Sequence, residues 1–189
     1  MALVINLNQA DKVLSSIEEL ANKKYLPIVG PEKGRVLMDV LREIKPKRVL
    51  EIGALIGYST ILMAKELENE AKIITIEIDD DEAKIAEENI RKARIKPKID
   101  VIVGDALKIL PKLEGKFDFV FIDAAKREYI KYLKLIEDKL HKGSVIVADN
   151  AGSFAESMKA YLNFVRSSKK YKSRFVSVGN DGLEITTKI

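Results

Sequence analysis

The chain has 189 residues, of which 47% are hydrophobic, so we expect a single domain (residues 1–189) built around one core. It has no cysteine and one histidine, His141. This excludes disulfides, thiolate nucleophiles and zinc sites built from cysteine or several histidines. Any bound metal must therefore be held mainly by oxygen ligands. The net charge of +4 is spread over alternating acids and bases, so nucleic-acid binding is allowed but not demanded.

No apolar run is long enough for a membrane span, and charged residues interrupt the first 20 positions, so we expect a cytoplasmic protein without membrane contact. Abundant Lys, Glu and Ile, without Trp or Cys, are typical of a thermophile. Two helices are predicted ahead of the sheet, at 9–23 and from Pro31 onward, where proline suits the first helical turn. We expect residues 1–45 to cap the cofactor and substrate side.

The middle of the chain alternates short β-branched runs with amphipathic stretches, the pattern of βαβ units and a parallel sheet. The predicted strands are 48–52, 73–78, 100–103, 117–122 and 144–148, and the predicted helices are 59–67, 81–93, 106–110, 127–140 and 154–167. Two further strands, 174–178 and 183–187, flank a GNDG tract that indicates a hairpin. The expected fold is α/β: one Rossmann-like, doubly wound, mostly parallel seven-stranded sheet with helices on both faces and an antiparallel C-terminal hairpin.

A tight glycine turn, from Gly53 to Gly57, follows the first strand and leads into a helix. Ligands of open α/β sheets bind at this place. The spacing is G-x-x-x-G and lacks the G-x-G-x-x-G of dinucleotide folds, which argues against a NAD-dependent oxidoreductase. Alone the turn is a weak signal, because glycines often serve only to let a strand enter a helix.

Acids end the next two strands. Glu77 closes the second strand, where a carboxylate can accept both hydroxyls of an unphosphorylated ribose. Asp105 follows the third strand and could accept a hydrogen bond from an adenine amino group, with the Ala106 N–H nearby. An N-cap role for Asp105 is equally good physically. The two roles are compatible if one carboxylate oxygen caps the helix and the other accepts the hydrogen bond from the adenine amino group.

Three more oxygen donors are expected at the same edge of the sheet. Asp123 ends the fourth strand, and Asp149 with Asn150 ends the fifth. Such a set leaves room for water and substrate oxygens, as a catalytic site for Mg²⁺ or Ca²⁺ requires. Acids at strand ends are common in α/β proteins of every kind, so this pattern alone leaves the metal open.

From about Pro27 to the C-terminus, the chain resembles the cation-dependent O-methyltransferases, the family of catechol and caffeoyl-CoA O-methyltransferases. The stretches that carry the resemblance, in matching order, are LPIVGPEKG (26–34), VLEIGALIGYS (49–59), IITIEID (73–79), VGDA (103–106), FDFVFIDAAK (117–126), IVADN (146–150) and DGLEI (181–185). The resemblance implies S-adenosylmethionine as cofactor. The residues expected around it are Glu51, Gly53, Gly57, Tyr58, Ser59, Glu77, Asp105, Ala106 and Asp123.

The same resemblance implies a metal triad of Asp123, Asp149 and Asn150, which would hold Mg²⁺ or another divalent cation such as Ca²⁺ or Mn²⁺. Lys126 matches the general base of the family. The implied activity is metal-assisted methylation of a hydroxyl on a small phenolic or related acceptor. The relatives are generally dimers, so we expect a homodimer.

Two departures from the family bear on the acceptor. Residues 151–154 lead quickly into the predicted helix, which predicts an open acceptor pocket, and Phe175 stands where the catechol enzymes place an acid that contacts the second substrate hydroxyl. A vicinal diol is therefore in doubt. The segment FIDAAKREY (121–129) also resembles bacterial members that methylate a tRNA wobble-uridine hydroxyl. That alternative would need an aromatic platform and a phosphate-contacting rim, which Phe154, Tyr161 and the basic stretch 166–174 could supply.

Other residues support less specific predictions. Tyr129 and Tyr132 could line a pocket, but their spacing fits ordinary helix packing better. His141 is expected at a helix exit on the surface, with no catalytic role. A non-catalytic nucleotide-binding protein on the same fold is the alternative from another functional class, and the intact acid and lysine set argues against it.

Overall fold

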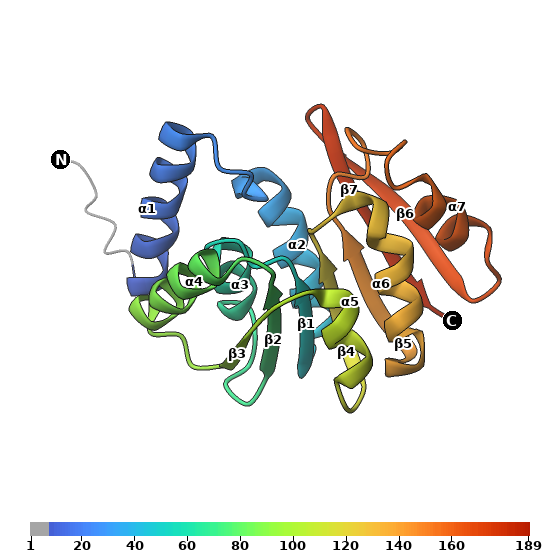
Figure 1. Cartoon of the computed structure of the whole chain (residues 1–189), viewed down its shortest axis with the longest axis horizontal. Coiled ribbons are helices and arrows are strands. Elements are labelled where there is room, and N and C mark those ends of the chain that lie inside the picture. Colours follow the sequence, from blue (N-terminus) through green and yellow to red (C-terminus); the bar gives the residue numbers. More distant parts are fainter. Residues whose placement is uncertain (1–7) are drawn as a thin grey trace.

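Seven strands form one sheet in the order β3-β2-β1-β4-β5-β7-β6 (Figure 1). The computed structural model describes residues 8–189. The strands are β1 (Arg48–Ile52), β2 (Lys72–Glu77), β3 (Lys98–Val103), β4 (Phe117–Ile122), β5 (Leu140–Ala148), β6 (Tyr171–Val178) and β7 (Asp181–Lys188). Strands β1 to β5 pair in parallel, whereas β7 is antiparallel to both β5 and β6. The predicted fold is therefore confirmed.

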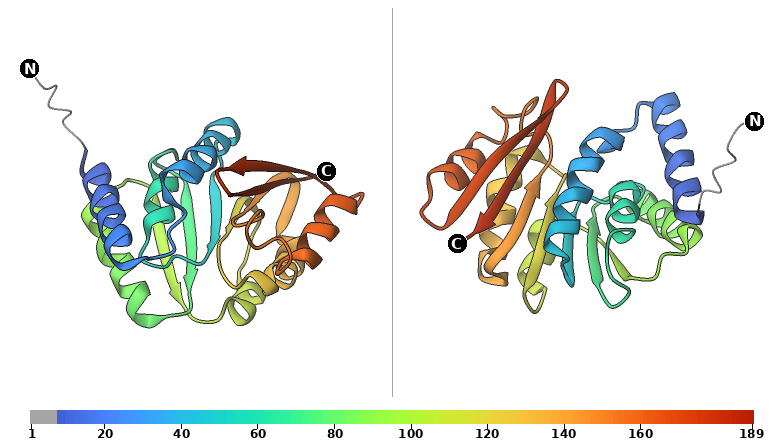
Figure 2. Two further views of the ribbon diagram at one scale, coloured as in Figure 1. Left: turned by 90° about the horizontal axis from the view of Figure 1, so that it is seen from above. Right: turned by 180° about the vertical axis from the view of Figure 1, so that it is seen from behind.

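Helices cover both faces of this sheet, as the view from above shows (Figure 2). They are α1 (Gln9–Lys24), α2 (Gly30–Ile44), α3 (Tyr58–Ala64), α4 (Asp80–Ala93), α5 (Ala106–Ile109), α6 (Tyr129–Ile136) and α7 (Lys159–Ser167), with 3₁₀ turns at Leu110–Lys112, Lys126–Glu128 and Glu137–Lys139. Within residues 8–189 no helix is long and apolar enough to cross a membrane.

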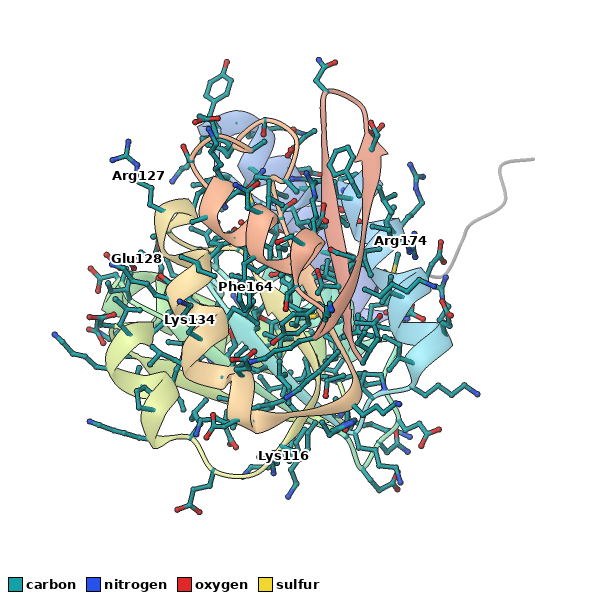
Figure 3. The ribbon with its side chains drawn as sticks, turned by 90° about the vertical axis from the view of Figure 1, so that its right-hand side faces the viewer. Lys116, Arg127, Glu128, Lys134, Phe164 and Arg174 are labelled. Atoms are coloured by element: carbon teal, nitrogen blue, oxygen red, sulfur yellow. The ribbon has the colours of Figure 1, made fainter. Side chains whose placement is uncertain are left out.

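Two hydrophobic clusters form the core, one on each face of the sheet. Side chains of α1 to α4 pack on the face that receives Phe119 and Phe121, whereas α5 to α7 pack on the face that receives Val120 and Ile122. Successive strand residues point to opposite faces, so a strand that is apolar throughout must be covered on both sides. On the second face α6 and α7 lie side by side, and Lys134 Nζ lies 6.0 Å from the ring centre of Phe164 (Figure 3).

The predicted helix over 127–140 was too long. It ends at Ile136, and β5 begins at Leu140, which places His141 in the strand and not at a helix exit. The cause is a link to the neighbouring strand: His141 Nε2 lies 2.8 Å from Asp118 Oδ1, and His141 N donates to Ser144 Oγ. His141 lies near the start of β5, at the opposite end of the strand from Asp149 and Asn150.

The helix predicted over 154–167 begins later, at Lys159, and turns occupy residues 149–158. Asp181 explains this difference, because its Oδ1 accepts the backbone N–H groups of Gly152 and Ser153. Asn150 adopts a left-handed conformation at φ 63° and starts the loop away from a helical path. The loop after β5 is thus longer than the sequence predicts, and it is anchored on the start of β7.

Candidate functional site

A cavity of about 550 Å³ opens at the carboxyl ends of β1, β2, β4 and β5, where the sequence predicts a ligand site. This volume lies in the usual range for small-molecule sites, roughly 300–1,000 Å³. The segment 27–29, which joins α1 to α2, contributes apolar side chains to its wall. The predicted cofactor residues that line it are Gly53, Tyr58, Ser59, Glu77, Asp105, Ala106 and Asp123.

The glycine turn after β1 is required by its surroundings. Gly53 has φ +99°, and a Cβ atom there would lie 2.2 Å from the backbone oxygen of Asp123. Gly57 has φ +86°, and a Cβ atom there would lie 3.2 Å from the Cα atom of Ala86 on α4. Gly53 therefore brings the chain close to the end of β4 and lines the cavity. Gly57 does not line the cavity and lets α3 approach α4, and its predicted contact with the cofactor stays a prediction.

Glu51 also does not line the cavity, and its predicted contact with the cofactor stays a prediction. Its side chain is fully buried beneath the glycine turn, where it accepts hydrogen bonds from Ser59 Oγ at 2.6 Å, Thr75 Oγ1 at 2.6 Å and Thr60 Oγ1. Burial raises the pKa of Glu51 to about 7, and the three hydroxyl hydrogen bonds oppose this only in part. Glu51 thus fixes Ser59, which does reach the cavity.

Glu77 joins the glycine turn to the end of β2. Its Oε2 accepts the Leu55 N–H at 2.7 Å, and its Oε1 accepts the Ile78 N–H at 2.7 Å. The Glu77 side chain is 6% exposed at the cavity wall, while the neighbouring Ile78 is 73% exposed and presents apolar surface there. Ionised carboxylate oxygens have several lone pairs, so these amide contacts leave acceptor capacity for hydroxyl groups.

Asp105 has the N-cap role that the sequence predicts. Its Oδ1 accepts the Leu107 N–H at 2.9 Å and so caps α5. Its Oδ2 lies 3.7 Å from Lys108 Nζ, and Asp105 and Ala106 both line the cavity. Only one carboxylate oxygen is used by the cap, so the second can still serve a ligand.

The three predicted metal ligands come together at the ends of β4 and β5. Asp123 N donates to Ile52 O, and Asp149 N donates to Ile122 O, which aligns both acids at one sheet edge. Asp149 is 2% exposed, and burial together with the charge of Asp123 raises its pKa to about 6. Asn150 Nδ2 donates to Asp181 Oδ2 at 2.8 Å, which leaves the Asn150 Oδ1 atom for another partner.

This donor set fits a hard cation. Within residues 8–189 no cluster of three or more His, Cys, Asp or Glu side chains is suited to a metal, so a cation here depends on the amide oxygen of Asn150 beside the two carboxylates. Both carboxylates already face cations, Asp123 facing Lys126 and Asp149 facing Lys33. A cation bound here would share each carboxylate with a lysine, and carboxylate and amide oxygens are the ligands that Mg²⁺ and Ca²⁺ accept.

Lys126 lies between the acidic cluster and the core. Its Nζ donates to Asp123 Oδ1 at 2.7 Å and lies 3.0 Å from the hydroxyl of Tyr129, and it lines the cavity. Tyr129 is fully buried, as its helical spacing predicts, but the sequence did not reveal its contact with Lys126. Tyr132, also buried in the core, reaches the cavity wall.

Lys33 and Asp181 also belong to this site, although the sequence does not predict them as site residues. Lys33 Nζ contacts Asp149 at 2.6 Å and Asp181 at 3.0 Å. Both residues lie in stretches that carry the family resemblance, LPIVGPEKG and DGLEI. Their place in these stretches was the only sequence signal that Lys33 and Asp181 could belong to the site. Nothing in the sequence indicates that the two stretches are in contact.

The residues suggested from the sequence for RNA recognition do not all gather at the cavity. Phe154 lines it, but Tyr161 is fully buried. The basic stretch 166–174 begins at the opposite edge of the sheet, since Tyr171 pairs with Lys188. Arg127 and Arg174 extend from opposite sides of one face of the molecule (Figure 3). The residues suggested from the sequence for RNA recognition therefore do not cluster at the cavity, and tRNA as the acceptor stays an untested alternative.

Phe175 is placed on β6, opposite Glu184 of β7, and its side chain is 43% exposed. It does not line the cavity, and its ring lies over Gly182. The position that the resemblance aligns with a substrate-contacting acid therefore contributes no polar group to this site.

Comparison with known proteins agrees with this site. A family model described as O-methyltransferase matches residues 6–166. Catechol O-methyltransferase B of Danio rerio is 35% identical over 186 residues, which cover 91% of this chain and 70% of the relative. Catechol O-methyltransferase of Mus musculus is 33% identical over 168 residues, covering 85% of this chain and 63% of the relative. The chain thus spans about two thirds of the length of these relatives.

Solved structures extend the match. The O-methyltransferase TomG from Streptomyces achromogenes, involved in tomaymycin synthesis and solved in complex with SAM, has a TM-score of 0.85 and 25% identity, covering 98% of this chain and 92% of that chain. A putative O-methyltransferase from Klebsiella pneumoniae has a TM-score of 0.84 and 27% identity, covering 98% and 92%. With the family match over most of its length, the chain belongs to the O-methyltransferase family, as the sequence predicts.

Proposed function

We propose that this chain transfers the methyl group of S-adenosylmethionine to a hydroxyl of a small phenolic or related acceptor, with the help of a divalent cation. One observation carries the proposal: Lys126 and the acids Asp123 and Asp149 line the same cavity as the glycine turn and Glu77. A methyl-donor site, a base and a cation site would thus meet in one place.

The methyl donor would lie along the ends of β1, β2 and β3. Gly53 would let the ligand approach the backbone, and Ser59, which donates to Glu51 and lines the cavity, would face its methionine part. Glu77 would accept the ribose hydroxyls, while Asp105 and Ala106 would face the adenine. The TomG structure in complex with SAM supports this choice of cofactor.

Methyl transfer is an in-line displacement, in which the oxygen–carbon bond forms as the carbon–sulfur bond breaks. The products are a methyl ether and S-adenosylhomocysteine. The acceptor hydroxyl must lose its proton, and Lys126 Nζ in its neutral form would take it. Asp123 and the Tyr129 hydroxyl hold this nitrogen at the cavity wall, so its position is fixed before the acceptor binds.

Asp123, Asp149 and Asn150 would hold the cation, which we take to be Mg²⁺ or another divalent ion such as Ca²⁺ or Mn²⁺. When bound, such an ion polarises the acceptor hydroxyl and fixes its position. Apolar groups from segment 27–29 and from Phe154 would then cover the ring of a phenol. The catechol O-methyltransferase relatives support a small acceptor of this kind. Cytoplasmic location, the homodimer and the capping role of residues 1–45 stay predictions.

Transfer of a labelled methyl group from S-adenosylmethionine tests the proposal. Catechol, several monophenols and bulk tRNA are offered as acceptors, with Mg²⁺, with EDTA, and with EDTA followed by excess Mg²⁺. We expect at least one phenol to be labelled, with labelling lost in EDTA and restored by Mg²⁺. Labelling that EDTA leaves unchanged would contradict the cation, and labelling of tRNA alone would contradict the small acceptor.

A further inference from the structure

Lys33 places an ammonium group inside the acidic cluster. It lies on the first turn of α2, and its Nζ donates to Asp149 Oδ1 at 2.6 Å, to Asp149 Oδ2 at 2.8 Å and to Asp181 Oδ2 at 3.0 Å. The three side chains are 14%, 2% and 18% exposed, respectively. Both oxygens of the most buried acid in the cluster are thus engaged by a lysine that is 116 residues away in sequence.

We propose that Lys33 is a built-in counter-cation that competes with the divalent cation for Asp149 and so weakens its binding. The inference rests on the cation site of the proposed function. In the metal-free chain Lys33 neutralises a carboxylate that burial would otherwise leave without a counter-charge. A divalent ion that binds Asp149 must then share this carboxylate with an ammonium group a few ångströms away, or displace it.

Charge repulsion fixes the direction of the effect. An ammonium group and a divalent ion on one carboxylate repel each other, and low exposure keeps water from screening the repulsion. Removal of the Lys33 charge should strengthen cation binding for two reasons. It ends this repulsion, and it leaves the Asp149 carboxylate without a counter-ion. We therefore expect affinity for a divalent cation to rise about tenfold or more when Lys33 is neutralised.

Asp181 gives the displaced lysine a second partner. Its Oδ2 accepts from both Lys33 Nζ and Asn150 Nδ2, so the lysine can leave Asp149 and keep one ion pair. The same contact with Asn150 directs the amide oxygen away from Asp181. Asp181 is thus a positioning residue, which holds the loop after β5 and the start of β7 together beside the cation ligands.

Binding of Mn²⁺ alone, followed by the electron paramagnetic resonance signal of the free ion at pH 8, tests the inference without an activity assay. The variants are Lys33→Met, Lys33→Arg and Lys65→Met. Lys65 is the matched control, a partly buried lysine (23% exposed) that pairs with Asp11 far from the cavity. Circular dichroism checks that each variant is folded, and thermal shift by Mn²⁺ gives a second readout, because a ligand that binds more tightly stabilises more.

We expect Lys33→Met to lower the Kd for Mn²⁺ at least tenfold and to enlarge the thermal shift, while Lys33→Arg and Lys65→Met stay near the parent protein. Tight binding by Lys33→Met where the parent binds weakly supports the inference most strongly. An unchanged or higher Kd in folded Lys33→Met, with measurable binding by the parent, overturns the inference and leaves the proposed cation site intact. Absence of Mn²⁺ binding in all four proteins overturns both the inference and the proposed cation site, while the labelled-methyl assay still tests methyl transfer itself.

Discussion

Replacement of Glu51 by Gln should stabilise the protein at alkaline pH. Burial raises the pKa of Glu51 from 4.5 to about 7, and no cation in the described part of the chain pairs with this side chain. The folded state therefore holds a proton that the unfolded chain releases near its ordinary pKa. The contribution of protonated Glu51 to the free energy of unfolding is fully present below pH 4.5 and is lost as the pH rises through 7. At ~1.4 kcal/mol per pKa unit, the loss is about 3 kcal/mol.

Urea unfolding of the parent and of Glu51→Gln at several pH values measures this effect. The difference in unfolding free energy, variant minus parent, should rise by about 3 kcal/mol between pH 4.5 and pH 8. Glu184→Gln is the matched control, because Glu184 is equally buried but receives two hydrogen bonds from Arg166. It should destabilise at pH 8, since it leaves a guanidinium without its partner. A difference for Glu51→Gln that does not change with pH would refute the reasoning.

Two further substitutions test the turn and the base. Gly53→Ala should abolish binding of S-adenosylmethionine and lower the melting temperature, because the added Cβ would lie 2.2 Å from the backbone oxygen of Asp123. Gly143→Ala is the control, because Gly143 has a similar φ of +91° but no atom lies within 4 Å of an added Cβ, so this variant measures the cost of backbone strain alone. Equal losses in both variants would contradict the steric argument. Tyr129→Phe removes the hydroxyl beside Lys126 and should lower kcat about tenfold at unchanged KM for the cofactor, as expected for the loss of one hydrogen bond that holds the base in place. Steady-state kinetics measures this, and an unchanged kcat would show that the hydroxyl does not position the base.

The strands and their end residues could be predicted because their signals are local. Apolar β-branched runs mark the buried strands, and parallel pairing puts the residues that follow them at one edge, which is why Asp123, Asp149 and Glu77 meet at the cavity. The burial of Glu51 also had a local signal. It shares a sheet face with Val49, two residues earlier, and that face is covered by α3.

The contacts that complete the site could not be predicted, because they join segments that are distant in sequence. Lys33 and Asp149 are 116 residues apart, and Asn150 and Asp181 are 31 residues apart. Their pairing depends on how α2 and β7 pack at the end of β5, which no local pattern records. The late start of α7 has the same origin, since Asp181 binds the loop amides that a helix would otherwise use.

Methyl transfer by Lys126→Met tests the central claim, that this cavity methylates a hydroxyl with Lys126 as base. The product is identified as a methyl ether by mass spectrometry, and binding of S-adenosylmethionine is measured separately by calorimetry. We expect kcat to fall ~10²–10⁴-fold with cofactor affinity retained, while Lys134→Met, an exposed lysine on α6, keeps parent activity. Parent-level ether formation by Lys126→Met would contradict the account.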